Sequence, residues 1–129
     1  MPALKAGLVG AGVFGGYHAG KIAESEHARF VGVFDPDQDR SASLADKHGV
    51  QSFASQDALF GACDAVLVAC PATYHEAVVR AALMADCHVM VEKPLALTGH
   101  AADQLAQLAD ERSEERRVGK ECRSRWSPY

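Results

Sequence analysis

The chain has 129 residues and a mass of 13.7 kDa, which suffices for one compact domain but not for two. Hydrophobic residues make up 48% and charged residues 23%, so collagen-like, disordered and disulfide-dense classes are excluded. The apolar runs are short and interrupted by glycine, and the first residues do not resemble a signal peptide. We therefore expect a cytoplasmic protein with no membrane partner. Free thiols are expected at the four cysteines, which lack paired spacing: Cys63, Cys70, Cys87 and Cys122.

The net charge of -4 is distributed unevenly. Residues 1–111 carry 7 Lys/Arg and 14 Asp/Glu, whereas residues 112–129 carry 6 and 3. Because residues 1–111 carry a net negative charge, they give no support for a nucleic-acid partner. Hydrophobic periodicity stops where the charge changes sign. We therefore expect one domain over residues 1–111, followed by a tail over 112–129 that is non-native or disordered.

Apolar strands alternate with amphipathic helices along the body of the chain. Strands are expected near 5–9, 30–35, 50–53, 65–69 and 88–92, with helices near 13–24, 36–49 and 56–60 and from Thr73 and Thr98 onward. This alternation predicts an α/β fold with a Rossmann-type, doubly wound parallel sheet and helices on both faces.

For two of these helices we also predict which residues face the sheet, and for one of them how it begins. In the first, we place Val13, Tyr17 and the residues from Ala19 to Ile22 on the inner face. Thr73 and Glu76 have the spacing of a capping box at the start of the fourth. Its expected inner stripe consists of Ala77, Val78, Ala81, Ala82 and Ala85.

The first predicted strand leads into Gly10-x-Gly12-x-x-Gly15. Gly10 permits a tight turn, Gly12 lets the backbone approach a pyrophosphate, and Gly15 lets the helix lie against the strand. Free N–H groups at the helix N-terminus then face the phosphates. Such a motif alone is a weak signal, and the glycines could serve the turn only. The strand, the helix and the acidic residue that follows together favour dinucleotide binding.

Asp35 ends the next strand, 20 residues after Gly15. Its carboxylate can accept hydrogen bonds from the adenosine ribose and repel a 2′-phosphate. The alternative is that Asp35 is the N-cap of the helix opened by Pro36, and both roles are compatible. No Arg or Lys directly follows Asp35, so NAD is favoured over NADP as the cofactor.

Two further segments follow strands at the edge where such sheets bind ligands. The first runs from Cys70 and Pro71 through Thr73 to His75, and the second is Glu92-Lys93-Pro94. Thr73 could be only a helix cap, His75 an exposed polar residue and Cys70 a small apolar one. Lys93 could orient or protonate a substrate oxygen, or be a solvated loop residue. The histidines show no ligand spacing, so we expect no metal.

Several motifs in this order resemble the Gfo/Idh/MocA family, the enzymes related to glucose–fructose oxidoreductase and inositol dehydrogenase. The motifs are Gly10 to Gly15 followed by Tyr17-His18-Ala19, then Phe34-Asp35-Pro36-Asp37, Pro71-x-x-x-His75 and Glu92-Lys93-Pro94. The resemblance covers residues 4 to about 111. It implies a nicotinamide-dependent oxidoreductase that moves hydride to or from a hydroxyl carbon of a sugar, cyclitol or related small molecule.

The resemblance also implies residue roles. Residues matching Gly10, Ala11, Gly12, Val13 and Phe14 cradle the pyrophosphate in the family, and the one matching Asp35 contacts the ribose. The stretch from Pro71 to His75 borders the nicotinamide, and Glu92 lies near its ribose. Lys93 is implied to contact the reacting substrate oxygen and is the candidate catalytic residue. The bond between Lys93 and Pro94 is expected to be cis.

Family members are two to three times longer, with a second domain that supplies most of the substrate pocket and the subunit interface. We therefore expect a truncated N-terminal part of an oligomeric enzyme that binds nucleotide without turnover. Its last strand should be an open, association-prone sheet edge. A non-catalytic NAD(H)-binding sensor or partner module is the alternative function, and binding of FAD is a third, weaker one.

Overall fold

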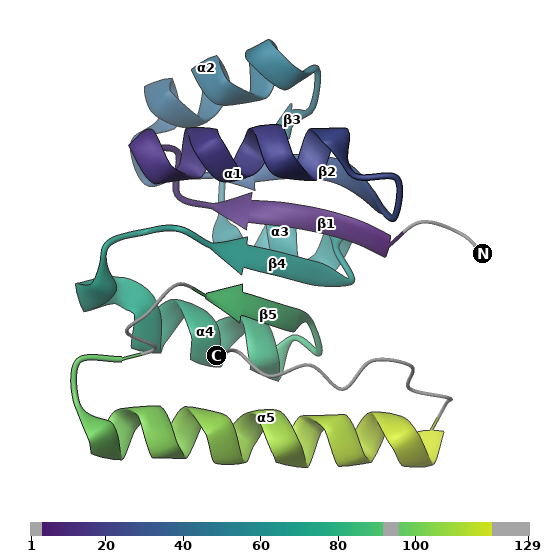
Figure 1. Ribbon diagram of the computed structural model, residues 1–129, viewed down its shortest axis with the longest axis vertical. Helices are drawn as coiled ribbons and strands as arrows, with labels where there is room; N and C mark the ends of the chain where they lie inside the picture. The colour runs from purple at the N-terminus through teal and green to yellow at the C-terminus, as the bar shows by residue number, and fades with distance from the viewer. Residues whose placement is uncertain (1–3, 92–95, 120–129) are drawn as a thin grey trace.

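The structure, a computed structural model, describes residues 4–91 and 96–119, with side chains described as far as residue 112. Strands and helices alternate along these residues (Figure 1). The strands are β1 (Leu4–Val9), β2 (Ala28–Phe34), β3 (Gln51–Ser52), β4 (Ala65–Val68) and β5 (His88–Val91). The helices are α1 (Val13–Glu24), α2 (Gln38–His48), α3 (Gln56–Ala62), the 3-10 turn η1 (Ala72–Tyr74), α4 (His75–Met84) and α5 (Gly99–Gly119).

The strands form one sheet in the order β3-β2-β1-β4-β5, and every neighbouring pair is parallel. At the centre, Leu8 of β1 is level with Val33 of β2 and with Leu67 of β4. The order reverses at β1, which is the topological switch point of a doubly wound fold. The predicted α/β class and parallel sheet are confirmed.

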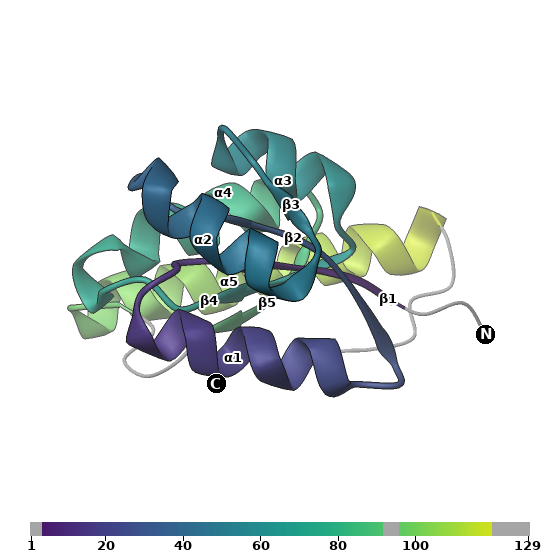
Figure 2. The same cartoon turned by 90° about the horizontal axis from the view of Figure 1, so that it is seen from above.

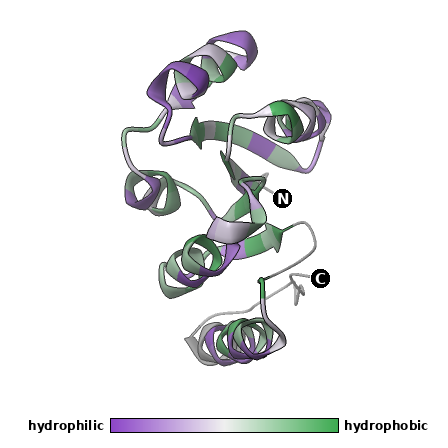
Figure 3. Ribbon diagram, turned by 90° about the vertical axis from the view of Figure 1, so that its left-hand side faces the viewer, coloured by the Kyte–Doolittle hydropathy of each residue, from purple (hydrophilic) through white to green (hydrophobic). Residues whose placement is uncertain are grey.

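Successive residues of β1 point to opposite faces of the sheet, so the sheet has two cores. Leu8 packs with Ala19 and Ile22 of α1 and with Leu44 of α2. Val9 belongs to the other core, which α3, α4 and α5 cover. Figure 3 looks onto the carboxyl ends of the strands and shows α1 on one side of the sheet and α3 and α4 on the other. Viewed from above, the same helices flank the sheet (Figure 2).

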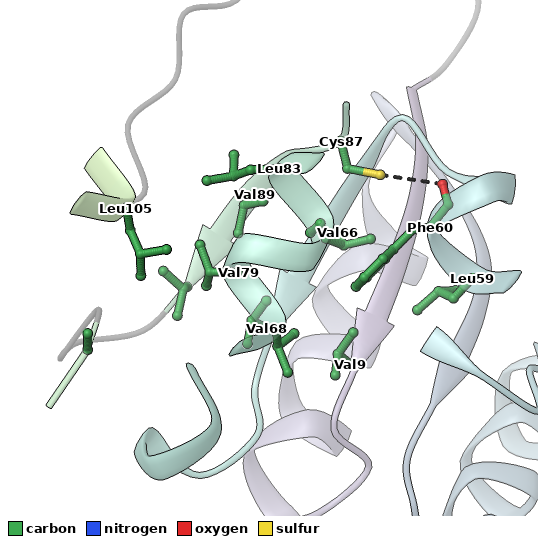
Figure 4. Close-up of a cluster of buried hydrophobic side chains, with 14 of the residues drawn as sticks. Val9, Leu59, Phe60, Val66, Val68, Val79, Leu83, Cys87, Val89 and Leu105 are labelled. Carbon is green, nitrogen blue, oxygen red and sulfur yellow. Dashed lines mark hydrogen bonds between the residues drawn. The ribbon is translucent and has the colours of Figure 1, made fainter. Parts of the chain in front are cut away.

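The larger core is built from valines on the central strands and from bulky side chains on the helices (Figure 4). Phe60 and Leu59 of α3 are buried together in this core, and α3 packs on β1 and β2. The buried Cys87 thiol donates a hydrogen bond to the Phe60 carbonyl oxygen at 3.4 Å. Cys63, Cys70 and Cys87 are free thiols, as expected for these three cysteines.

Local sequence signals fix both ends of α2 and the start of α5. Asp37 caps α2 by accepting hydrogen bonds from the N–H groups of Asp39 and Arg40, and Gly49 ends that helix at φ +66°. Thr98 caps α5, as expected, because its hydroxyl oxygen accepts from the Ala101 N–H at 3.1 Å.

The capping box expected at Thr73 and Glu76 is wrong. A 3-10 turn precedes α4, Tyr74 is the N-cap residue, and no side chain caps this helix start. Turning the backbone tightly at 72–74 moves the first α-helical residue to His75. Thr73 therefore lies inside the preceding turn, where its hydroxyl cannot cap α4.

Two expected inner faces also differ from the structure. On α1, Ala19 and Ile22 are buried as expected, and Gly15 faces the sheet with them. Val13 and Tyr17, in contrast, are 89% and 61% exposed. On α4, Ala77 and Ala85 are exposed and Ala81 is half-buried. The buried set there is Val78, Val79, Ala82 and Leu83. Val78 and Ala82 are buried as expected. Larger side chains remove more apolar surface from water, so Val79 and Leu83 face the core in place of Ala77 and Ala85.

The helix α5 continues beyond residue 111, where the domain was expected to end, and reaches Gly119. The Arg112 guanidinium ties this helix to the turn between α4 and β5. Its Nη2 atom lies 2.6 Å from Asp86 Oδ1 and donates to the Met84 carbonyl oxygen at 3.3 Å. The boundary between 111 and 112 remains a prediction. No helix within the described ranges is both long and apolar enough to cross a bilayer.

Replacing Leu105 of α5 by alanine should destabilise the fold by about 2–5 kcal/mol, because its fully buried side chain would leave a cavity. Leu97, which is 65% exposed, provides the matched control, and Leu97→Ala should change stability by about 0.5 kcal/mol or less. Urea denaturation of both variants measures the difference. Equal stabilities would show that α5 contributes nothing to the core.

Candidate functional site

The loops that follow β1, β2 and β4 converge at the carboxyl edge of the sheet. The Gly10 N–H donates to the Phe34 carbonyl oxygen at the end of β2, at 2.9 Å. On the other side, the Ala69 N–H donates to the Val9 carbonyl oxygen at 2.8 Å. The loop after β1 is thus held between its two neighbours, at the place where parallel α/β sheets bind ligands.

Gly10 and Gly15 are required by the backbone itself. Gly10 has a φ of +107°, and a Cβ there would lie 2.8 Å from backbone atoms of Ala69 and Cys70. A Cβ on Gly15 would collide with the carbonyl group of Gly10. The first glycine therefore allows the turn, and the last allows α1 to lie against the end of β1.

Gly12 has a different reason to be glycine. Its φ of -80° is accessible to any residue, and a Cβ there would meet no atom within 4 Å. It is the N-cap residue of α1 and makes no side-chain cap. The first N–H groups of a helix have no partner within the helix, so those of α1 are directed toward the open space beside Gly12. An anionic group fits this position, because the N–H groups and the helix dipole both favour negative charge.

The Asp35 carboxylate joins this loop to the end of β2. Its Oδ2 atom accepts from the Ala11 N–H at 2.7 Å, and Oδ1 accepts from the Asp37 N–H at 2.8 Å. Asp35 is not the N-cap of α2, because Asp37 has that role. A carboxylate has about four acceptor positions, so these two bonds leave capacity for hydroxyl donors.

An apolar cavity of about 650 Å³ adjoins the other side of the glycine loop. The exposed side chains of Val13 and Phe14 form one wall. The remaining lining residues come from α1 and from the segment after β4: Tyr17, His18, Ala69, Cys70, Pro71, Ala72 and His75. This shape and chemistry suit a flat organic ring.

His75 is buried, with 3% of its surface exposed, whereas an exposed polar residue was the simpler expectation. Its Nε2 atom lies 2.9 Å from the Cys70 carbonyl oxygen. This contact holds the segment after β4 against the start of α4 and keeps Cys70 and Pro71 in the cavity wall. Thr73 is exposed and does not line the cavity.

Cys70 contributes a half-buried thiol to the cavity. Burial raises the pKa of this thiol above its ordinary value of 9.0, and the nearby Asp35 carboxylate raises it further. The thiol is therefore protonated at neutral pH and acts as a small apolar group rather than as a nucleophile.

The structure brings together the glycine loop, Asp35, Pro71 and His75. The candidates Glu92 and Lys93, with Pro94, lie outside the described residues. Tyr17 and His18 were not among the expected site residues. Their position one turn beyond the glycine motif was the available signal, and it was obscured because Tyr17 was placed on the buried face of α1.

A strand, a glycine-rich turn, a helix and an acidic residue directly after the second strand define a dinucleotide-binding Rossmann domain. The chain belongs to the Gfo/Idh/MocA oxidoreductase family with an NAD-binding Rossmann fold, whose sequence profile matches residues 4–120. This match confirms the resemblance noted from the motifs.

Individual relatives agree. UDP-N-acetylglucosamine 3-dehydrogenase of Acidithiobacillus ferrooxidans is 37% identical over 84% of this chain and 34% of its own length. Inositol 2-dehydrogenase of Corynebacterium glutamicum is 36% identical over 81% of this chain and 32% of its own length. The chain therefore spans about a third of the length of these curated relatives.

Solved structures give the same result. The A. ferrooxidans enzyme GnnA superposes with a TM-score of 0.83 at 37% identity, over 87% of this chain and 36% of that one. GenD2 from gentamicin A biosynthesis, in complex with NAD, gives 0.83 at 32% identity, over 87% and 33%. Biliverdin reductase from Synechocystis, in complex with biliverdin and NADP+, gives 0.79 at 33% identity, over 91% and 36%.

Replacing either of two adjacent glycines, Gly15 or Gly16, by alanine should change the stability of the fold in opposite directions. Gly15→Ala should destabilise the chain by about 1–3 kcal/mol, because its Cβ collides with the Gly10 carbonyl group. Gly16→Ala should stabilise it by up to about 1 kcal/mol, since a Cβ at Gly16 meets no atom within 4 Å and alanine favours the helix. Urea denaturation distinguishes the two. A stable Gly15→Ala variant would contradict the described contact between α1 and β1.

Proposed function

We propose that this chain binds the nicotinamide cofactor of an oxidoreductase that moves hydride between that cofactor and a hydroxyl carbon of a sugar, cyclitol or related small molecule. The observation that carries the proposal is the 2.7 Å hydrogen bond from the Ala11 N–H to Asp35 Oδ2. It sets a carboxylate suited to ribose hydroxyls beside a helix N-terminus suited to a pyrophosphate. In a dinucleotide the adenosine ribose is bonded directly to the pyrophosphate, so the two binding groups lie side by side as the ligand requires.

The described residues fit such a cofactor, because the space that a Cβ on Gly12 would occupy is open. Under this proposal, the backbone from Gly10 to Gly15 holds the pyrophosphate and Asp35 holds the adenosine ribose. The apolar cavity beside Val13, Phe14 and Pro71 receives the nicotinamide end, with His75 fixing the cavity wall. The nicotinamide, when bound, supplies or accepts the hydride.

NAD is the proposed cofactor, with NADP the weaker ligand. A 2′-phosphate would meet the negative charge of Asp35, whose position is fixed by two backbone N–H groups. Among the structural relatives, GenD2 is described with NAD and biliverdin reductase with NADP+, so the fold accommodates either. The choice therefore depends on side chains near the ribose.

The reaction itself requires more than this chain, which spans about a third of its curated relatives. The names of these relatives, dehydrogenases of an amino sugar nucleotide and of inositol, support a sugar-like or polyol substrate. On the strength of the family motifs, Lys93 is proposed to contact the reacting oxygen and Glu92 to lie near the nicotinamide ribose. Thr73 is proposed to belong to the stretch from Pro71 to His75 that borders the nicotinamide. Hydride transfer needs both carbons held in a near-attack geometry, so we expect the 129-residue chain to bind cofactor without turnover.

The whole protein is proposed to be a homo-oligomeric, cytoplasmic enzyme. The free thiols of Cys63, Cys70 and Cys87 suit a reducing compartment. The proposed domain, residues 1–111, ends within α5, and the tail over 112–129 is proposed to be foreign to it.

Calorimetric titration of the full 129-residue chain with NAD and with NADP tests the proposal. We expect saturable binding of NAD and binding of NADP at least about tenfold weaker, because the phosphate is repelled by Asp35. Gly12→Val should abolish the binding of both nucleotides while changing the free energy of unfolding by less than about 1 kcal/mol, since a Cβ at this position meets no atom within 4 Å. A folded chain that binds neither nucleotide would refute the proposal. Unchanged NAD binding by Gly12→Val would refute the assigned position of the pyrophosphate.

A further inference from the structure

A second pocket, of about 390 Å³, lies between α1 and α2 on the adenosine side of the glycine loop. Ala11 and Gly12 form its border with that loop, so the pocket adjoins the proposed pyrophosphate and ribose positions. Its opposite wall is charged, unlike the apolar cavity, and comes from α2 and its N-cap residue: Asp37, Asp39, Arg40, Ser43 and Lys47. The proposed function assigns no role to these side chains.

Within this wall, Asp37 and Arg40 form an ion pair, with Arg40 Nε lying 3.5 Å from Asp37 Oδ2. The Asp37 side chain is fixed from the other side, because Oδ1 accepts from the N–H groups of Asp39 at 3.1 Å and Arg40 at 3.3 Å. Its carboxylate therefore caps α2 and engages the guanidinium at once. Both side chains remain more than half exposed, so the pair is open to a ligand in the pocket.

The pair is connected to Asp35 through the backbone. The Asp37 N–H donates to Asp35 Oδ1, while Asp35 Oδ2 holds the Ala11 N–H. A phosphate on the ribose held by Asp35 would therefore be close to this pocket. An arginine in the first turn of a helix is well suited to bind such a phosphate, because the guanidinium makes paired charge-assisted hydrogen bonds. In this chain that arginine is engaged by Asp37.

We propose that the Asp37–Arg40 pair is a second cofactor-selecting element, in addition to Asp35. Asp37 keeps the Arg40 guanidinium occupied and adds a negative charge, and both effects exclude a 2′-phosphate from the pocket. Removing the charge of Asp37 releases Arg40 to bind that phosphate. The inference rests on the proposed binding of a nicotinamide dinucleotide.

The test is the Asp37→Asn substitution in the full chain, with NAD and NADP affinities measured by calorimetry or by competition. Asparagine keeps a side-chain oxygen that can cap α2, so the fold should be preserved, and thermal unfolding verifies this. The measured quantity is the ratio of the dissociation constant of NADP to that of NAD. We expect this ratio to fall about tenfold relative to the unmodified chain.

Asp39→Asn is the matched control. It removes the same charge from the same pocket wall, and among the described residues the Asp39 carboxylate takes part in no ion pair. The ratio should change less than about twofold in this variant, since Arg40 stays engaged. Adding Arg40→Gln to Asp37→Asn should reverse the gain, because the released cation is then absent.

Three results would overturn the inference. The ratio could stay unchanged in a folded Asp37→Asn chain that binds NAD, it could fall equally in Asp39→Asn, or it could stay low after Arg40→Gln is added. An equal fall in Asp39→Asn would show that net charge alone sets the preference. A ratio that stays low after Arg40→Gln is added would show that Asp37 acts without Arg40, because the double variant has the net charge of the unmodified chain. Failure of the unmodified chain to bind NAD is a distinct result, and it would refute the proposed function together with this inference.

Discussion

The hydrogen bond from the Ala11 N–H to Asp35 Oδ2 is the constraint on which the candidate site depends. It joins the loop after β1 to the residue that directly follows β2, and these two segments are far apart in sequence. The same carboxylate accepts from the Asp37 N–H and so sets the direction in which the chain enters α2. One side chain thereby fixes the glycine loop, the proposed ribose position and the start of the next helix. Its proposed binding role is inseparable from its structural one.

A second constraint acts on the other side of the loop. Gly10 approaches the backbone of Ala69 and Cys70 so closely that no Cβ fits, and the Cys70 carbonyl oxygen is held in turn by His75. The segment after β4 is therefore positioned by the turn after β1 and by the first residue of α4. The glycine loop and the apolar cavity share this backbone and form one continuous surface.

Regular structure was predictable where the sequence pattern is dictated by burial on both faces of the sheet. The run 65–69 and the helix ended by Gly49 are found near their expected places, since continuous apolar runs and a left-handed glycine have few alternatives. The rotation of helices about their axes was less predictable. Contact between Gly15 and Gly10 turns Val13 and Tyr17 outward, and this contact arises only when α1 packs onto β1.

In the candidate site, too, the features set by local sequence were predictable and those that arise from packing were not. The glycine spacing and Asp35 could be read from the sequence because their local context is distinctive. His75 could not be placed correctly, because its burial depends on a 3-10 turn that displaces the apparent capping box. The charged pocket between α1 and α2 was also missed, since it arises from two helices that meet only in the folded chain. Glu92 and Lys93 remain predictions based on the motif alone.

Val13 and Phe14 follow the N-cap of α1 and also line the apolar cavity. Under the proposed function, their main-chain N–H groups bind the phosphates and their side chains contact the nicotinamide ring. Phosphate binding and ring contact therefore depend on different atoms of the same residue. Mutation at either position can reshape the cavity while the phosphate cradle, which depends on the backbone, is retained. Such a separation lets a cofactor domain acquire new side-chain chemistry beside the reacting ring without losing the ligand that all its reactions require.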